Sequence, residues 1–445
     1  MTTVRVRYGV ALRIAATALA GAGFAAATPA ADEGWPMYGH GYDNTRFSPL
    51  KQIDTKNVHK LKLAYSLQLG SLRSNESSPI VVGDTMYVST SWGPRSVFAL
   101  DARTGKLKWT YQPDVPDDTL QYACCDVNSR GVTYVDGKLY IGRLDGKLSA
   151  VDAATGKELW TTGVVDYKQG SVITSPPLFV KGKVITGFGG GEYGARGSLQ
   201  AFDAATGKEL WRTYTVPGPG EANNETWKGD SWQHGGAAPW LVGSYDPKTN
   251  TVFWGTSNPG PWNSVVRSTG TSDYGQYSNL YSSTTLALDP DTGKIKWWVQ
   301  STPQDAWDYD GVNELVLADL DIGGTKTPVY MKADRNGFFY VVNRETGKIV
   351  SAEKFVPTNW ANKIDIATGK PEENPDKRPA PGHPVKDVCP NLIGGKNWQP
   401  MSYNPMTGLV YIPSNNMCMD WSVSEVNYRK GVFCLGAEFP TKPGP

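Results

Sequence analysis

Short apolar runs alternate with polar turns along most of this chain, and one such unit recurs. In its first copy the apolar residues 97–100 lead into an Asp-Ala-Arg-Thr-Gly-Lys turn that starts at Asp101, followed by a run that ends at Trp109. Glycine supplies the positive φ that such a turn needs, and aspartate hydrogen-bonds to the backbone of its own turn. The pattern therefore predicts a strand, a tight turn and a second strand that carries tryptophan.

The unit returns with its aspartate at Asp152, Asp203 and Asp289, so that the first two intervals are 51 residues and the third is 86 residues. Degenerate copies surround Asn343, Asp246 and Asn404. Another hairpin precedes each copy, as in residues 132–141 with an Asp-Gly turn. Four strands at a period near 50 residues favour a β-propeller over a sandwich. We predict that the repeated tryptophans dock one blade on the next.

The composition agrees with a folded, β-rich chain and excludes several other classes. Among 445 residues, 49 Gly and 31 Pro are too few for a collagenous chain, and 11% aromatic residues exclude intrinsic disorder. The formal net charge of +1 gives no electrostatic case for a nucleic-acid partner.

The N-terminus has the pattern of a secretory signal. Arg5, Arg7 and Arg13 precede an apolar run from Ile14 to Ala26 that is too short to span a bilayer, and small residues follow it. We predict a signal peptide over residues 1–30 that is cleaved near residues 27–31, with a buried helix or a membrane anchor as the alternatives. No other stretch is apolar enough to span a membrane, so we expect an exported, periplasmic protein.

Five cysteines add candidate chemistry. Cys124 and Cys125 are neighbours, and a bridge between neighbours persists only where its surroundings hold it, often at a functional site. Cys389 and Cys418 are candidates for a second bridge, and Cys434 is then the one cysteine outside a bridge. There is no Cys-x-x-Cys-His sequence, so this chain carries no covalent c-type haem.

Three motifs together resemble the quinoprotein alcohol dehydrogenases, which are eight-bladed β-propellers that bind pyrroloquinoline quinone (PQQ) and a metal. They are the repeated turn with its tryptophan, the pair Cys124-Cys125 followed by Asp126, and the Trp-Asp-Tyr-Asp-Gly sequence of residues 307–311. The segments around Asn258, Arg335 and residues 395–398 resemble the ethanol-type branch.

The resemblance runs from about Trp35 to the last residue and implies an all-β, eight-bladed propeller that forms a PQQ-binding domain over residues 31–445. About 415 residues remain after the predicted signal, which is room for about seven blades at the observed period. We therefore expect the last blade or blades to lie beyond this sequence.

The resemblance also implies a cofactor site. The vicinal cysteines would cover one face of the PQQ ring and Trp240 the other; the basic and polar residues would bind its carboxylates, and Arg335 would lie at its quinone oxygens. The implied cofactor residues are Glu76, Cys124, Cys125, Arg130, Thr174, Trp240, Arg335 and Asn397.

Glu192, Asn258 and Asp308 are the implied metal ligands, and such oxygen ligands suit Ca²⁺ or another large hard cation rather than zinc or copper. Asp310 lies two residues beyond Asp308, so in an extended segment both side chains would face the same way. Calcium-dependent members carry a small or uncharged residue at this place, whereas an aspartate resembles the lanthanide-dependent members. We predict a lanthanide ion, with Ca²⁺ as the alternative; the motif could also be only a turn at a blade tip.

The implied activity is the oxidation of primary alcohols to aldehydes. Asp308 would act as the base that removes the alcohol proton. The hydride would pass to C5 of the quinone with assistance from the metal, and Arg335 would stabilise charge on the quinone oxygen. A small primary alcohol, a soluble cytochrome c that accepts the electrons, and a second copy in a homodimer are the expected partners. The alternatives are a non-catalytic propeller scaffold and a quinoprotein dehydrogenase for a polyol or sugar. A scaffold has no need for the vicinal cysteines and the metal ligands together.

Overall fold

The computed structural model describes residues 34–90 and 96–445, so the predicted signal peptide lies outside the described residues. The described chain consists of β-strands and short 3₁₀ turns joined by loops. Within these residues, no helix combines the length and the hydrophobicity that a membrane crossing requires.

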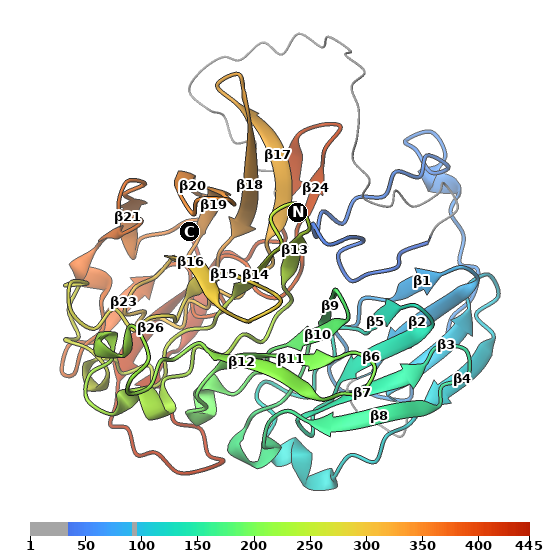
Figure 1. Cartoon of the computed structure of the whole chain (residues 1–445). Helices are drawn as coiled ribbons and strands as arrows, with labels where there is room; N and C mark the ends of the chain where they lie inside the picture. Colours follow the sequence, from blue (N-terminus) through green and yellow to red (C-terminus); the bar gives the residue numbers. More distant parts are fainter. Residues whose placement is uncertain (1–33, 91–95) are drawn as a thin grey trace.

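Antiparallel four-stranded sheets with their strands in chain order follow one another along the sequence (Figure 1). The first is formed by β1 (Ile80–Val82), β2 (Thr85–Ser89), β3 (Val97–Asp101) and β4 (Leu107–Tyr111). The second is formed by β5 (Thr133–Val135), β6 (Lys138–Gly142), β7 (Lys147–Asp152) and β8 (Glu158–Gly163). The third is formed by β9 (Leu178–Val180), β10 (Lys183–Thr186), β11 (Ser198–Asp203) and β12 (Glu209–Tyr214).

Two more sheets continue this series before the pattern changes. The fourth contains β13 (Ser244–Asp246), β14 (Thr251–Gly255), β15 (Thr284–Leu288) and β16 (Ile295–Gln300), and the fifth contains β17 (Val316–Ile322), β18 (Thr325–Ala333), β19 (Phe338–Asn343) and β20 (Ile349–Lys354). In the last sheet, β26 (Met417–Val423) pairs with β23 (Val385–Val388), β27 (Ala437–Glu438) and β28 (Thr441–Pro443). Two hairpins accompany it: β21 (Ala361–Ile364) with β22 (Pro371–Glu373), and β24 (Ser402–Asn404) with β25 (Leu409–Tyr411).

The 3₁₀ turns lie in the loops between strands. They are η1 (Val58–Lys60), η2 (Asp117–Gln121), η3 (Tyr167–Gln169), η4 (Gly191–Tyr193), η5 (Asn224–Thr226), η6 (Ser231–His234), η7 (Ser264–Val266) and η8 (Pro375–Lys377).

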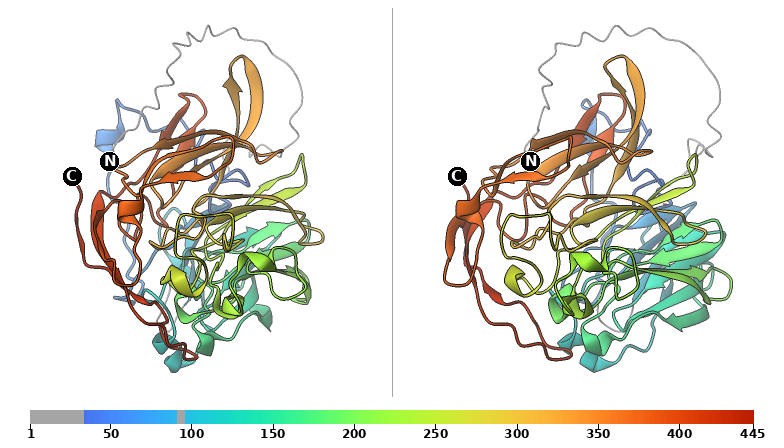
Figure 2. Two further views of the ribbon diagram at one scale, coloured as in Figure 1. Left: turned by 90° about the vertical axis from the view of Figure 1, so that its left-hand side faces the viewer. Right: turned by 60° about the vertical axis from the view of Figure 1, so that its left-hand side comes forward.

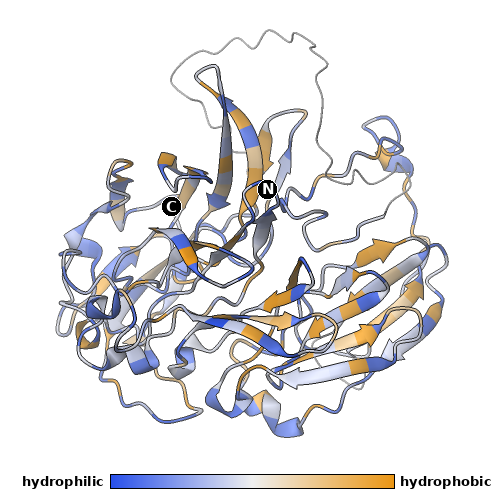
Figure 3. Cartoon of the chain, viewed as in Figure 1, coloured by the Kyte–Doolittle hydropathy of each residue, from blue (hydrophilic) through white to orange (hydrophobic). Residues whose placement is uncertain are grey.

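Successive sheets meet through their first strands, because β5 lies against β9 and β13 lies against β17. The middle strands are buried between neighbouring sheets: β3 is buried along Val97–Leu100, whereas the outer strand β8 alternates between exposed and half-buried residues. Figure 3 shows hydrophobic and hydrophilic residues mixed along the strands of these sheets. This arrangement confirms the predicted all-β propeller.

The repeated tryptophans dock one sheet on the next, as predicted. The indole of Trp160 lies on Gly207 of the following repeat, where an added Cβ atom would be 2.7 Å from the ring, and its Nε1 donates to the carbonyl oxygen of Ala204 at 3.2 Å. Trp109 makes the same contacts with Gly156 and the carbonyl oxygen of Ala153. The glycine of each turn therefore serves both the turn and the seam between two blades.

The aspartate of each repeat accepts hydrogen bonds from its own turn, also as predicted. In the third repeat, Oδ1 of Asp203 accepts from the backbone N–H of Ala205 at 3.1 Å and of Thr206 at 2.8 Å. The Thr206 hydroxyl donates to the same oxygen, and these bonds lower the pKa of Asp203.

Replacing Gly207 by alanine is expected to destabilise the protein more than the same change at Gly182, which is the matched control. Both glycines have positive φ, 72° and 77°, so each variant loses about 1–2 kcal/mol to a strained backbone. Only Gly207 faces a ring, since nothing lies within 4 Å of an added Cβ at Gly182. Overpacking adds about 1–3 kcal/mol to the cost at Gly207. Urea unfolding of the two variants measures the difference, and equal losses would contradict the docking role of Trp160.

Candidate active site

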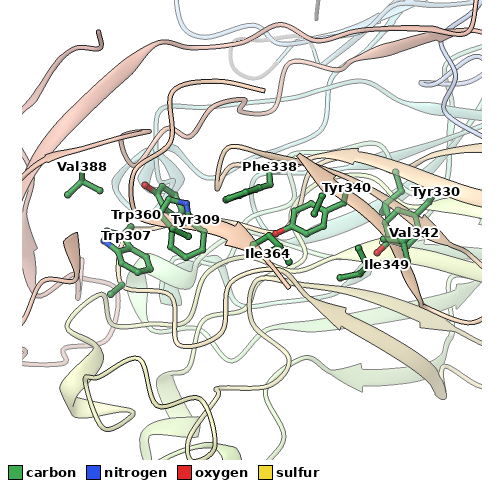
Figure 4. Packing of buried hydrophobic residues seen from close by; sticks show 14 of the residues in the cluster. Trp307, Tyr309, Tyr330, Phe338, Tyr340, Val342, Ile349, Trp360, Ile364 and Val388 are labelled. Carbon is green, nitrogen blue, oxygen red and sulfur yellow. The ribbon is translucent and has the colours of Figure 1, made fainter. Parts of the chain in front are cut away.

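The Trp-Asp-Tyr-Asp segment is anchored by its two aromatic residues. Trp307 and Tyr309 are fully buried, and the Trp307 ring lies 5.0 Å from that of Trp360 (Figure 4). The Tyr309 hydroxyl donates to the carbonyl oxygen of Pro390 at 2.6 Å. These contacts fix the backbone from which the carboxylates of Asp308 and Asp310 project.

The segment is not extended, which corrects one step of the sequence argument. Asp308 has a φ of 66°, in the left-handed region, and no strand includes residues 305–311. The Asp305 carboxylate holds this turn by accepting from the N–H of Trp307 at 3.1 Å and of Tyr309 at 2.8 Å. The side chains of Asp308 and Asp310 still converge, but the turn rather than strand periodicity brings them together.

Both carboxylates contact Arg335, which lies two residues beyond the end of β18. Nη1 of Arg335 lies 3.3 Å from Oδ2 of Asp308 and 3.2 Å from Oδ2 of Asp310, and it also donates to the backbone oxygen of Asp308 at 3.0 Å. All three side chains are buried. The structure thus brings together the two residues predicted to be catalytic.

Asp310 also links the predicted metal ligands to the predicted cofactor surface. Its Oδ1 accepts from the backbone N–H of Asn258 at 2.8 Å, and its Oδ2 accepts from Nε1 of Trp240 at 3.0 Å. The position of the Trp240 ring therefore depends on Asp310.

Glu192 lies in the short turn η4, between Gly190 and Gly194, which both have positive φ. This turn is adjacent to the segments of Trp240 and Asn258, because the N–H of Gly236 donates to Ala195 and the N–H of Ala237 donates to Asn258. Three loops that are distant in sequence, those of Glu192, Trp240 and Asn258, therefore lie next to one another.

The three carboxylates influence one another electrostatically. Burial raises the pKa of Asp308 well above its ordinary value, Arg335 opposes this, and the negative charges of Asp310 and Glu192 add to it. Burial also raises the pKa of Glu192, and the charge of Asp310 raises it further. Only the Arg335 guanidinium makes ion pairs with these carboxylates among the described residues. The site therefore holds three carboxyl groups and one guanidinium, so that a further positive charge is needed to keep all three carboxylates ionised.

A second arginine forms the other half of the site. Arg130 makes an ion pair with Glu76 at 2.6 Å and donates to the hydroxyl of Thr174 at 2.6 Å. Its guanidinium lies 4.8 Å from the centre of the Trp240 ring and 5.7 Å from that of Trp398. Glu76 and Thr174, predicted to bind the cofactor, are here the partners that hold Arg130.

Both predicted disulfides are present. Cys124 is bonded to Cys125, in the loop that leads to Arg130, and Cys389 is bonded to Cys418. Cys434 is free and buried. The Asp126 carboxylate, next to the vicinal pair, accepts from the backbone N–H of Ser74 at 3.1 Å and so ties the disulfide loop to the segment of Glu76.

Asn397 joins the site through its backbone. Its carbonyl oxygen accepts from Nδ2 of Asn313 at 2.9 Å, and Oδ1 of Asn313 accepts from the N–H of Arg335 at 3.0 Å. Its own side chain closes its loop by donating to the carbonyl oxygen of Ile393 at 3.2 Å. Asn313 therefore connects Asn397 to Arg335.

Sequence reasoning missed Asn313 and the buried ion pair of Glu314 with Lys396, which are 2.7 Å apart. Glu314 also accepts from the N–H of Met401 at 2.6 Å, so the pair fixes the loop of Asn397. A signal existed, because Asn313 and Glu314 follow Asp310 closely in an otherwise apolar stretch.

The residues present fit a cation and a planar polycarboxylate. Within the described chain, Oδ1 of Asp308 and the Nε atoms of Arg130 and Arg335 are buried and have no hydrogen-bond partner. An orphaned carboxylate oxygen in a negative site suits a multivalent cation. Two arginines that flank the Trp240 ring suit an aromatic molecule with several carboxylates.

The metal assignment itself stays a prediction. In the part of the chain that the structure describes, no three His, Cys, Asp or Glu side chains form a cluster ready to hold a metal ion. Arg335 contacts two of the predicted ligands, Asp308 and Asp310, in this arrangement.

Comparison with known proteins gives consistent matches over most of the chain. The family model described as "PQQ: Glucose/ethanol/alcohol dehydrogenase, beta-propeller domain" matches residues 35–387. The chain is 44% identical over 424 residues to the lanthanide-dependent methanol dehydrogenase of Methylacidiphilum fumariolicum, covering 91% of this chain and 68% of that protein. It is 41% identical over 444 residues to a quinoprotein ethanol dehydrogenase of Pseudomonas putida, covering 91% of this chain and 70% of that protein.

Among solved structures, a europium-containing methanol dehydrogenase superposes with a TM-score of 0.88 at 43% sequence identity, covering 93% of this chain and 74% of that one. The quinohemoprotein alcohol dehydrogenase of Comamonas testosteroni superposes with a TM-score of 0.86 at 40% identity, covering 94% of this chain and 64% of that one.

Proposed function

This chain belongs to the family of PQQ-dependent glucose, ethanol and alcohol dehydrogenase β-propellers, and we propose that it oxidises primary alcohols to aldehydes in the periplasm. The observation that carries the proposal is the network in which Asp310 joins Trp240, Asn258 and Arg335. It connects the residues expected to contact the cofactor with those expected to hold the metal.

The chain's own residues have separate roles in this reaction. Asp308, whose buried carboxylate lies beside Arg335, accepts the proton of the alcohol hydroxyl. Arg335 and Arg130 bind and orient the anionic cofactor on the face of Trp240. The disulfide Cys124–Cys125 covers the opposite face. When bound, PQQ supplies the two-electron acceptor for the hydride that leaves the alcohol carbon.

Glu192, Asn258, Asp308 and Asp310 would hold the cation, which would supply Lewis-acid activation of the quinone. Three carboxylates offset by one guanidinium suit a trivalent ion better than a divalent one, because a higher charge compensates more of the excess negative charge. We therefore propose a lanthanide as the resident metal, with Ca²⁺ as the alternative.

The proposed compartment follows from the N-terminal sequence and the two disulfides, since such bonds persist in oxidising compartments. We propose a soluble cytochrome c as the acceptor of the electrons. The homodimer stays a prediction.

Reconstitution tests the proposed function. The purified chain is incubated with PQQ and either La³⁺ or Ca²⁺, and dye-linked oxidation of ethanol is measured. Turnover with PQQ and La³⁺, and none with La³⁺ alone, is the expected result. Absence of turnover with either metal, in a preparation that contains bound PQQ, would contradict the proposal.

A further inference from the structure

One long surface segment contacts the loops of two predicted metal ligands, Glu192 and Asn258, but contains none of the predicted site residues. Residues 424–436, here called the strap, connect β26 to β27 and contain no strand. In both views of Figure 2 the strap, in red, runs along one edge of the molecule to the loops at its lower end. Its contacts explain why it follows this path.

Both ends of the strap are fastened to the segment that follows Asn258. Nδ2 of Asn263 donates to the carbonyl oxygen of Ser424 at 3.0 Å, and the N–H of Trp262 donates to the carbonyl oxygen of Leu435 at 2.8 Å. The Trp262 side chain is buried. The ends of the strap are therefore fixed to the loop of one predicted metal ligand.

The strap is fastened near its C-terminal end to the turn of another predicted ligand. The N–H of Cys434 donates to the carbonyl oxygen of Glu192 at 2.7 Å, and the ring of Phe433 is stacked on that of Tyr193, 4.6 Å between centroids. Two consecutive residues of the strap thus contact two consecutive residues of η4.

A third contact reaches the residue that ends the same turn. The ring of Tyr428 is stacked on that of His234 at 3.6 Å, and Nδ1 of His234 lies 3.2 Å from the carbonyl oxygen of Gly194. Lys430 fastens the strap to a neighbouring loop through an ion pair with Asp166 at 3.1 Å. The strap therefore contacts the turn both near its C-terminal end and, through His234, near its middle.

The turn itself has few internal constraints on its backbone. It is a single 3₁₀ turn of three residues with no side-chain cap, and glycines with φ of 130° and 73° flank it. Glycine allows many backbone conformations, so the direction of the Glu192 side chain depends on contacts from outside the turn. The strap supplies some of these outside contacts, and it also contacts the loop of Asn258.

We propose that the strap positions Glu192 relative to Asn258 and so sets how tightly the metal site binds its cation. This inference rests on the proposed metal site. Phe433 and Tyr428 are positioning residues in it, since they act on the site through Tyr193 and through His234. Outer contacts that orient metal ligands typically contribute 10- to 100-fold to metal affinity.

The test uses Tb³⁺ alone, whose luminescence is sensitised by nearby tryptophan, with the full chain and without PQQ. Phe433→Ala and Tyr428→Ala are each expected to raise the Kd for Tb³⁺ about tenfold. Phe433 is 50% exposed and Tyr428 39% exposed, so truncation removes little core packing and both variants should fold. Phe433→Tyr keeps the stacked ring and should restore the wild-type Kd.

Tyr411→Ala is the matched control, because Tyr411 is also an aromatic residue, is 40% exposed and lies on β25, outside the strap. Its Kd for Tb³⁺ should equal that of the wild type. A Kd within twofold of wild type in both strap variants, or an equal loss in Tyr411→Ala, overturns the inference. Turnover of the wild type with PQQ and La³⁺ tests the proposed function separately. If the wild type turns over and the strap variants have unchanged Kd values for Tb³⁺, only the role of the strap is overturned. If the wild type shows neither turnover nor Tb³⁺ binding, both proposals are overturned.

Discussion

Asp308→Asn is expected to lower kcat for primary alcohols by about 10²- to 10⁴-fold, the range that general base catalysis contributes. Asparagine has the same size and keeps a carbonyl oxygen for the cation, but its amide cannot accept the hydroxyl proton. The contact of Arg335 with the backbone oxygen of Asp308 is also preserved, so the turn should keep its shape.

The measurement is dye-linked turnover after loading with PQQ and La³⁺, together with the metal content and the absorbance of bound PQQ. Asp321→Asn is the control, because Asp321 caps the exposed hairpin between β17 and β18 by accepting from Gly324 at 2.9 Å. A fully loaded Asp308→Asn protein that kept more than a tenth of the wild-type kcat would show that another group is the base.

Asp310→Ala should abolish turnover supported by La³⁺. The variant loses one of three carboxylates in a buried site, and it also leaves the N–H groups of Asn258 and Trp240 without their acceptor. Removing one partner from a buried charged arrangement typically costs about 3–5 kcal/mol. At about 1.4 kcal/mol for each factor of ten, a loss of this size corresponds to about 10²- to 4 × 10³-fold in metal affinity. Unchanged activity with La³⁺ in this variant would contradict the lanthanide assignment.

Asp310→Asn separates the loss of charge from the loss of hydrogen bonds. Its amide oxygen can still accept one of the two N–H bonds, while the negative charge is gone. We expect La³⁺-supported turnover to fall strongly and Ca²⁺-supported turnover to fall less, because a divalent ion needs less negative charge. Titration of both variants with each metal, followed by turnover, measures the difference. Equal losses with the two metals would assign Asp310 a purely structural role.

Much of the fold was predictable because it depends on local patterns. The Asp-x-x-Thr-Gly-Lys turns place strands on either side, and Trp160 and its equivalents lie where the repeat predicted them. Both disulfides were also anticipated, one between neighbouring residues and one between Cys389 and Cys418. Apart from that second bridge, these features need only residues that are close in sequence or that repeat at a fixed interval.

The site was predictable as a set of residues but not as a set of contacts. That Asp308 and Asp310 converge was expected, yet a left-handed turn held by Asp305 brings them together instead of an extended strand. Glu76 and Thr174 stay predicted cofactor residues, but the sequence did not show that both contact Arg130. No local pattern specifies which of several possible partners a long side chain will choose.

The order of residues is therefore enough to predict the repeat, the turns, the blade seams and the kinds of chemical groups available to the site. The folded chain was needed to show that Asp310 joins Trp240 to Asn258, that Arg335 contacts two carboxylates, and that residues 424–436 contact the turn of Glu192. Turns and strands follow from backbone preferences over a few residues, whereas these contacts depend on where loops separated by about 25 to more than 200 residues come to lie once the sheets have packed.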